Sequence, residues 1–420
     1  MITLLFIFLL LVGVPIAFVL GLSSLVYLID LELPLVLVPQ RLFNGLNSFL
    51  LLAVPLFILA GEIMNASGIT TRLLSLAAIF IRHVRGGLTY ITVVGSMLMS
   101  GITGVGSADA AAIGSVMIPA MQKQGYKDEY AAAILASSTI NGPIIPPSIA
   151  MVVYGAMTDV SIASLFLAGF IPGIVIALAI VIVAGFYAKK YDLPKSDMKP
   201  PQNSREMLEA CLAILMPVII LGGILGGIFT PTEAAGVAVT YAIIVGVVVL
   251  KQLKFSDLPR IFADAGRVTG SVLMIIGTAT LFGWVLAREN VPEQMAEYIL
   301  SLSNNKYMIL FLINVLLLFV GTFMETLAAI VLLIPVLFPL VTALGVDPVH
   351  FGVIVAVNLS IGLVTPPLGV CSFIACSIAK IKLEQISKAL IPFIVSTTIA
   401  LMIITYVPEI VLWLPRLFNR

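Results

Sequence analysis

The chain has 420 residues, of which 60% are hydrophobic and only 10% are charged, and its mean hydropathy is +1.17. Because soluble domains carry about a quarter charged residues, this composition excludes a water-soluble protein. The net charge of +1 excludes a strongly basic nucleic-acid binder, and two His and three Cys without a CxxC pair form no zinc-site or disulfide pattern.

Twelve stretches free of Lys, Arg, Asp and Glu divide the chain, and most are long enough to cross a bilayer, which takes roughly 20 apolar residues. In chain order they are Thr3–Ile29, Leu42–Gly61, Gly86–Ala108, Tyr130–Thr158, Val160–Ala188, Ala210–Thr232, Ala234–Leu250, Val268–Ala287, Tyr307–Met324, Thr326–Val346, Phe351–Ala379 and Ala389–Pro408. The sequence therefore predicts an all-α polytopic membrane protein.

Prolines and glycines recur at a fixed offset of 220 residues, which indicates a duplicated unit. The matching positions are Pro119 and Pro339, Gly125 and Gly345, Gly142 and Gly362, Pro146-Pro147 and Pro366-Pro367, and Pro172 and Pro392. We predict two repeats, 1–188 and 207–420, joined by the polar, Pro-rich cytoplasmic linker 189–206. Inverted repeats of this kind are typical of secondary transporters.

Two amphipathic segments, Thr70–His83 and Pro292–Asn305, decide the predicted topology. If both lie in the membrane interface, the two repeats have opposite orientations, as transporter architecture requires. This arrangement predicts nine crossings and two re-entrant hairpins, with the amino terminus inside and the carboxy terminus outside. It places 17 of the 22 Lys and Arg residues on the inner side, in agreement with the positive-inside rule.

Each repeat is predicted to contain one re-entrant hairpin and one broken helix. The hairpins cover about 88–122 and 307–342, and their tips are Ser100–Asp109 and Gly321–Thr326. The broken helices cover 130–158 and 349–379, where prolines remove backbone donors and clash with the preceding turn. Broken backbone inside a membrane survives only where it is buried in protein or lines a cavity.

The four breaks are the predicted substrate and ion site. A half-helix that ends at a break presents carbonyls that suit Na⁺, and one that begins there presents N–H groups that suit a carboxylate. The candidate residues are Thr103, Gly104, Ser107, Asp109, Asn141, Gly142, Pro143, Thr322, Met324, Glu325, Thr326, Gly362, Val364 and Thr365. Na⁺ is assigned to Thr103, Asn141 and Gly142 in the first repeat, and to Thr326, Gly362 and Thr365 in the second.

Several alternatives remain open at these positions. Asp109 and Glu325 are either functional carboxylates or helix-terminal stabilisers, and the proline breaks are alternatively structural kinks. Glu233, which follows Thr230-Pro231-Thr232, indicates a first-turn cap. No catalytic residue is predicted. The chain has no Gly-Lys pair, so it lacks the nucleotide-binding loop that would bind ATP. His83 and His350 fall in loops at opposite faces, which disfavours a protease.

Five segments carry a family resemblance: Gly104–Met121 (GVGSADAAAIGSVMIPAM), Gly226–Gly236 (GGIFTPTEAAG), Val320–Thr326 (VGTFMET), Gly345–Ile354 (GVDPVHFGVI) and Asn358–Gly369 (NLSIGLVTPPLG). Together they resemble the large membrane subunit, of DctM or SiaM type, of tripartite ATP-independent periplasmic (TRAP) transporters. The resemblance covers essentially the whole chain.

This resemblance implies an elevator-type, Na⁺-driven importer of an organic acid of the sialic acid or C4-dicarboxylate class, in the bacterial inner membrane. Its hairpins and broken helices would move against a scaffold of outer helices. It also implies two partners, a small four-helix membrane subunit and a soluble periplasmic substrate-binding protein. The alternative is a stand-alone Na⁺/dicarboxylate symporter or anion transporter of the same superfamily, which would need no binding protein.

Overall fold

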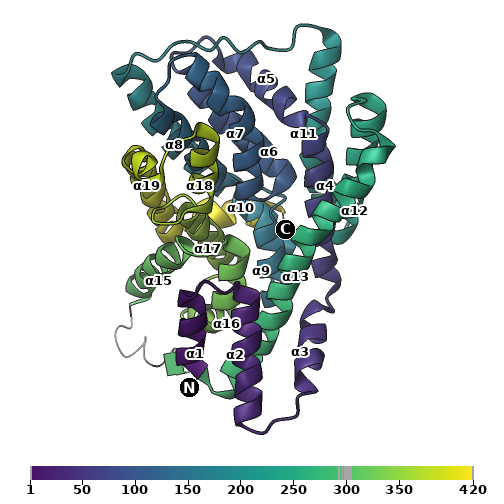
Figure 1. Cartoon of the computed structure of the whole chain (residues 1–420), viewed down its shortest axis with the longest axis vertical. Helices are drawn as coiled ribbons and strands as arrows, with labels where there is room; N and C mark the ends of the chain where they lie inside the picture. Colours follow the sequence, from purple (N-terminus) through teal and green to yellow (C-terminus); the bar gives the residue numbers. More distant parts are fainter. Residues whose placement is uncertain (1, 292–293, 296, 298–304, 419–420) are drawn as a thin grey trace.

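The computed structural model describes residues 2–291, 294–295, 297 and 305–418, and the regular elements of these residues are all helices (Figure 1). Among the described residues, seven helices are long and apolar enough to cross a membrane. They are Phe49–Ala66, Ile162–Lys190, Ser204–Leu225, Pro231–Val249, Phe255–Arg288, Thr326–Ala343 and Leu383–Tyr406. These helices confirm the predicted all-α polytopic class.

The first part of the chain, up to the linker, contains ten α-helices and two short 3₁₀ turns. They are α1 (Ile2–Leu11), α2 (Ile16–Asp30), α3 (Leu37–Leu46), η1 (Phe49–Leu52), α4 (Ala53–Ala66), α5 (Ile69–Ile81), α6 (Gly87–Thr103), α7 (Gly106–Lys123), α8 (Asp128–Ser138), η2 (Thr139–Asn141), α9 (Ile149–Thr158) and α10 (Ile162–Lys190).

The second part follows the linker. Its described helices are α11 (Ser204–Leu225), α12 (Pro231–Ile243), the π-helical η3 (Ile244–Val249), η4 (Phe255–Asp257), α13 (Leu258–Arg288), α15 (Lys306–Gly321), α16 (Thr326–Ala343), α17 (Pro348–Gly362), α18 (Val370–Ala379), α19 (Leu383–Tyr406) and α20 (Glu409–Phe418). Helices α7 to α10 begin at residues 106, 128, 149 and 162, and α16 to α19 begin 220 or 221 residues later. The offset seen in the prolines and glycines is therefore also an offset in helix starts.

The helices form two groups that lie side by side in Figure 1. Helices α2, α3 and α4 pack on the long helix α13, and α12 packs on α4. The other group is built around α10 and α17, and α18 packs there against both α7 and α8. The two groups meet where α4 contacts α6 and where α13 contacts α16.

The uniform hydrophobicity of Thr3–Ile29 predicts one spanning helix. The structure instead has two short helices there, α1 and α2, which pack against each other. Gly13 has a φ of +82° and ends α1, with the Val14 N–H donating to the Leu9 carbonyl at 3.1 Å. This left-handed cap needs glycine, and Pro15 then cannot continue the helix because it lacks an N–H.

The two predicted hairpins differ in packing. In the first, α6 and α7 pack on each other, and Gly104, at φ +63°, ends α6. The interruption is therefore only Gly104-Val105, which is shorter than the predicted tip Ser100–Asp109. In the second, α15 packs mainly along α17, and α16 packs on α9, α13 and α17. Of the two predicted interfacial segments, the first corresponds to α5, and most of Pro292–Asn305 lies outside the described residues.

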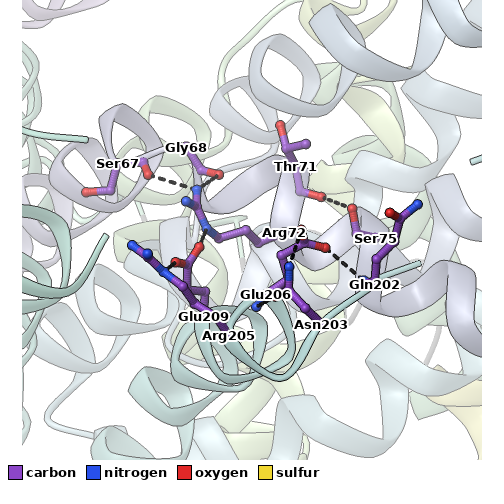
Figure 2. Close-up of polar contacts among 10 residues, drawn as sticks. All are labelled: Ser67, Gly68, Thr71, Arg72, Ser75, Gln202, Asn203, Arg205, Glu206 and Glu209. Atoms are coloured by element: carbon purple, nitrogen blue, oxygen red, sulfur yellow. Dashed lines mark hydrogen bonds and ion pairs between the residues drawn. The ribbon is translucent and has the colours of Figure 1, made fainter. Parts of the chain in front are cut away.

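An ion-pair cluster ties α5 to the start of α11 (Figure 2). Arg72 Nε donates to Glu209 Oε2 at 2.9 Å, and Arg205 Nε donates to the other carboxylate oxygen at 3.0 Å. Arg72 also donates to the Gly68 carbonyl, 3.0 Å away, just before α5 begins. The Arg72 and Glu209 side chains are only 20% and 12% exposed, so this pair is screened less than a surface salt bridge.

Candidate functional site

The tip of the first hairpin touches the break between α8 and α9 through glycine backbone. A Cβ built on Gly142 would lie 2.5 Å from the Gly106 nitrogen and 2.6 Å from its Cα. One built on Gly104 would lie 2.5 Å from the Pro147 carbonyl oxygen. These approaches are closer than any side chain allows, so glycine at both positions lets the tip rest on the break.

Asp109 links the two arms of this hairpin. Its side chain is fully buried in the first turn of α7. It accepts hydrogen bonds from Ser100 Oγ at 2.8 Å and from Thr103 Oγ1 at 2.6 Å, both at the end of α6. The Thr103 hydroxyl proton is therefore already used. Its oxygen also accepts from the Val105 N–H at 3.4 Å, which leaves one lone pair for another ligand.

The break itself buries one polar side chain without partners. Asn141 is 0% exposed, and neither its Oδ1 nor its Nδ2 has a hydrogen-bond partner within the described structure. By contrast, the Pro143 carbonyl accepts a hydrogen bond from Ser148 Oγ at 2.6 Å, and Ser148 also caps α9. Because a buried amide without partners costs about 1–3 kcal/mol, Asn141 is the most unusual polar group of this break.

The second repeat shows a related contact at the break between α17 and α18. A Cβ built on Gly362 would lie 2.5 Å from both the C and Cα atoms of Gly321, at the end of α15. The Thr326 hydroxyl is buried and, in the described structure, has no partner. The Glu325 carboxylate caps α16 by accepting from the Leu327 N–H at 2.9 Å. Stabilising the start of a helix is the structural role that the sequence left open for Glu325, and this hydrogen bond performs it.

The remaining second-repeat candidates make local contacts. The hydroxyls of Thr322 and Thr365 donate to the carbonyls of Phe319 and Ile361 at 2.7 Å each. The Val364 carbonyl accepts from Ser372 Oγ at 2.8 Å. Met324 is part-buried beside the end of α15. The hydroxyl protons of Thr322 and Thr365 therefore stabilise helix ends, and only the oxygen lone pairs of these side chains could bind a further ligand.

The two predicted repeats meet at the tip of the first predicted hairpin. A Cβ on Gly106 would lie 2.8 Å from the Thr139 carbonyl oxygen, 3.6 Å from Cys371 Sγ and 3.7 Å from Leu363 Cδ1. Leu363 and Cys371 flank the second break. Three of the four predicted breaks therefore adjoin one another around Gly106.

A cavity of about 350 Å³ opens beside this junction. Thr103 and Ser107 of the first hairpin line one side, and Glu62 and Asn65 of α4 line the other. Within the described residues, the second repeat contributes only Val268 and Ile374. The cavity thus brings together Thr103 and Ser107 of the predicted site. The predicted site residues of the second repeat do not line it.

Two polar features were not among the predicted site residues. Asn65 lies three residues after Glu62, so the two share one face of α4 and line the same cavity. Between α15, α17 and α19, Asn358 Nδ2 donates to Asn314 Oδ1 at 2.7 Å, and Asn314 Nδ2 donates to Thr405 Oγ1 at 3.1 Å, all buried. The available signal was an isolated Asn within each apolar stretch, since such a residue must find a partner.

Elsewhere, Glu233 forms a capping box with Thr230 at the start of α12, which confirms the cap predicted from the sequence. The Thr230 N–H donates to Glu233 Oε2 at 2.8 Å, and the Glu233 N–H donates to Thr230 Oγ1 at 3.3 Å. Glu233 is therefore not a candidate for substrate binding.

Comparison with solved structures shows the fold alone. The chain superimposes on the YdaH transporter of Alcanivorax borkumensis with a TM-score of 0.63 and 15% identity, covering 96% of this chain and 97% of that one. It superimposes on MtrF of Neisseria gonorrhoeae, described as one of a class of antimetabolite efflux pumps, with a TM-score of 0.64 and 15% identity. The coverage there is 92% and 85%.

Sequence comparison is more specific. The chain is 39% identical over 414 residues to the sialic acid TRAP transporter large permease protein SiaM of Vibrio cholerae, covering 98% of this chain and 96% of that protein. It is 38% identical to the C4-dicarboxylate large permease protein DctM of Pseudomonas aeruginosa, covering 90% and 88%. It is 43% identical to the isethionate permease DctMQ of Oleidesulfovibrio alaskensis, covering 96% of this chain and 64% of that one.

The family model for the DctM component of tripartite ATP-independent periplasmic transporters matches residues 3–410, nearly the whole chain. The resemblance inferred from the five sequence segments is therefore confirmed, and this chain is a transporter subunit rather than an enzyme. The chain belongs to the DctM family, the large permease components of TRAP transporters.

Proposed function

We propose that this chain carries an organic acid into the bacterial cell, driven by an inward Na⁺ gradient. The observation that supports this proposal is the position of two of the buried polar groups that have no partner in the described structure: Asn141 and Thr326 each lie beside a glycine contact between a hairpin end and a helix break. Buried polar groups are normally satisfied, so those that are not need an explanation, and a bound ion at the break would supply one.

Na⁺, as the co-transported ion, takes oxygen ligands. In the first repeat Asn141 Oδ1 would supply one, together with the backbone at Gly142 and the oxygen of Thr103, which ends α6 at the hairpin tip. In the second repeat the Thr326 hydroxyl would supply one, with Gly362 and Thr365. Asn141 Nδ2 is a donor, which suits a carboxylate of the substrate instead.

The substrate would pass through the cavity between α4 and the first hairpin. Thr103 and Ser107 offer hydroxyls there, and no Lys or Arg is among its lining residues as described. Since the relatives compared above are named as transporters of sialic acid, isethionate and C4-dicarboxylates, we propose an organic acid of this range, with sialic acid and C4-dicarboxylates first.

We also propose inverted repeats and an elevator movement. The repeated helix starts support duplication, and the division into a group around α13 and a group around α10 and α17 supports a scaffold and a moving part. The proposed orientation has the amino terminus inside and the carboxy terminus in the periplasm. The proposed partners are a small four-helix membrane subunit and a periplasmic substrate-binding protein.

The test is uptake into proteoliposomes that hold the chain with both partners. Uptake should follow an inward Na⁺ gradient, ignore ATP and stop when K⁺ replaces Na⁺. Asn141→Ala and Thr326→Ala should each raise the Na⁺ concentration for half-maximal uptake roughly 2- to 12-fold, because one neutral partner is worth about 0.5–1.5 kcal/mol. Thr342→Ala, on the same helix as Thr326 but bonded to the Phe338 carbonyl, is the matched control.

Unchanged Na⁺ dependence in both well-expressed variants would mean that the breaks are structural kinks. Omitting the binding protein distinguishes this proposal from the stand-alone symporter. Uptake by this chain alone would favour the symporter.

A further inference from the structure

A second cavity, of about 700 Å³, lies away from the transport site at the end of α10. Its lining comes from three places: the segment that leads into α8 with the first turn of α8, the end of α10 with the residues just after it, and the first turns of α19. Lys127 and Lys388 line it together with Gln385 and one carboxylate, that of Glu129. The lining is thus net positive.

One wall of this cavity is aromatic. Tyr130 and Tyr187 stack with ring centroids 5.0 Å apart, and Tyr191 follows at 5.5 Å from Tyr187. The ammonium groups of Lys127 and Lys190 lie 5.3 and 5.5 Å from the centre of the Tyr191 ring. Cation–π contacts hold these lysines beside the opening, and tyrosine beside lysine is typical of the border between membrane and water.

Beyond the cavity, towards the end of α19, this helix has an exposed apolar face. Ile391, Val395 and Ile399 follow Lys388 at helical spacing and are 52–57% exposed. From Lys388 to Ile399 the helix rises about 16 Å at 1.5 Å per residue, close to the roughly 15 Å depth of one leaflet's hydrocarbon. The exposed face therefore has the length of an acyl chain and begins at the charged cavity.

Helix α10 repeats this pattern in the opposite chain direction. Phe186, Ile182 and Leu178 precede Lys190 at intervals of four residues and are 54–71% exposed. Since α10 and α19 pack on each other, the cavity is bounded by two helices whose lipid-facing strips both start at its rim.

We propose that this cavity binds the headgroup of an anionic phospholipid, whose acyl chains lie along the exposed faces of α10 and α19. Lys127 and Lys388 would contact the phosphate, and Gln385 and the tyrosine hydroxyls would bond its esters or glycerol. A free phosphate satisfies the lysines but leaves both apolar faces unexplained, so the lipid is favoured over a soluble anion. Basic pockets between transmembrane helices bind such headgroups.

The proposed lipid site is separate from the proposed substrate and ion site, so it can be tested without an uptake assay. The purified chain in neutral detergent is titrated with phosphatidylglycerol, with phosphatidylcholine, and with water-soluble glycerol phosphate, while bound lipid is counted by native mass spectrometry. Phosphatidylglycerol should bind tightest. Lys127→Gln with Lys388→Gln should weaken it about 30-fold, since each lysine near an anionic surface contributes roughly fivefold.

The matched control is Lys199→Gln with Lys251→Gln, which removes the same charge from two exposed positions outside the cavity. It should leave phosphatidylglycerol binding within about twofold of the parent. Equal weakening in both double variants would overturn the proposal, because it would reflect general charge. Equal binding of phosphatidylcholine, or full competition by glycerol phosphate, would also overturn it. Unchanged thermal unfolding without lipid shows that the variants are folded.

Discussion

The contact between the first hairpin and its neighbouring break predicts that Gly142→Ala is strongly disruptive. The Gly142 backbone is helical, with φ −50° and ψ −58°, so alanine brings no dihedral penalty. Its Cβ would nevertheless lie 2.5 Å from the Gly106 nitrogen, and the backbones must separate by about 0.9 Å to reach an ordinary contact of 3.4 Å. Overpacking of this kind costs about 1–3 kcal/mol.

A shift of this size exceeds the roughly 0.5 Å within which a binding site must be held, so Gly142→Ala should lower both thermal stability and Na⁺-driven uptake. Gly362→Ala should do the same, since its Cβ would meet the Gly321 backbone at 2.5 Å. Gly270→Ala is the control: it lies in α13 with nothing within 4 Å, where alanine stabilises a helix by about 0.5–1 kcal/mol. If Gly142→Ala unfolds and transports like this control, the two backbones are not in contact and the reasoning fails.

Three further predictions concern stability and are checked by equilibrium unfolding in mixed micelles. Asp109→Asn should destabilise by about 1.5–3 kcal/mol, because the amide has one acceptor oxygen for two hydroxyl donors; an unchanged midpoint would contradict the link between the hairpin arms. Arg72→Ala should cost a similar amount by leaving Glu209 with one ion-pair partner. Arg85→Ala, whose pair is at least 71% exposed, should cost less than about 1 kcal/mol; equal losses would refute the role of burial. Thr230→Ala should cost about 0.5–2 kcal/mol through the capping box, and no loss would show that α12 does not depend on its cap.

The sequence predicted the all-α membrane class because that class depends on local residue type. Charge-free stretches give membrane helices, and a cluster of prolines such as Pro143, Pro146 and Pro147 interrupts one. Single prolines do not: Pro172 and Pro392 lie inside α10 and α19. The same logic applied to Gly13 and Pro15 together would have divided Thr3–Ile29 into α1 and α2. The prediction of a single helix over Thr3–Ile29 was wrong, because a search for charge-free stretches takes no account of residues that end helices.

The candidate site was harder to predict, since its chemistry depends on partners that are distant in the sequence. Thr103 and Asn141 look alike as polar residues at breaks, yet the first donates to Asp109 and the second has no partner among the described residues. Asn65 joins the cavity only because α4 packs beside the first hairpin. Residue type therefore indicated where the membrane helices break, and packing decides which groups at those breaks remain free for a ligand.

This distinction also bears on why glycine stands on both sides of each contact. At Gly106 and Gly142, and again at Gly321 and Gly362, backbone lies within reach of backbone, so the carbonyls and N–H groups of one break come close to those of the next. A side chain at any of the four positions would separate these backbone groups without removing any of them. At the proposed site, this arrangement would bring together the backbone carbonyls and N–H groups that bind Na⁺ and a carboxylate, since no Lys or Arg is among the described residues that line the cavity.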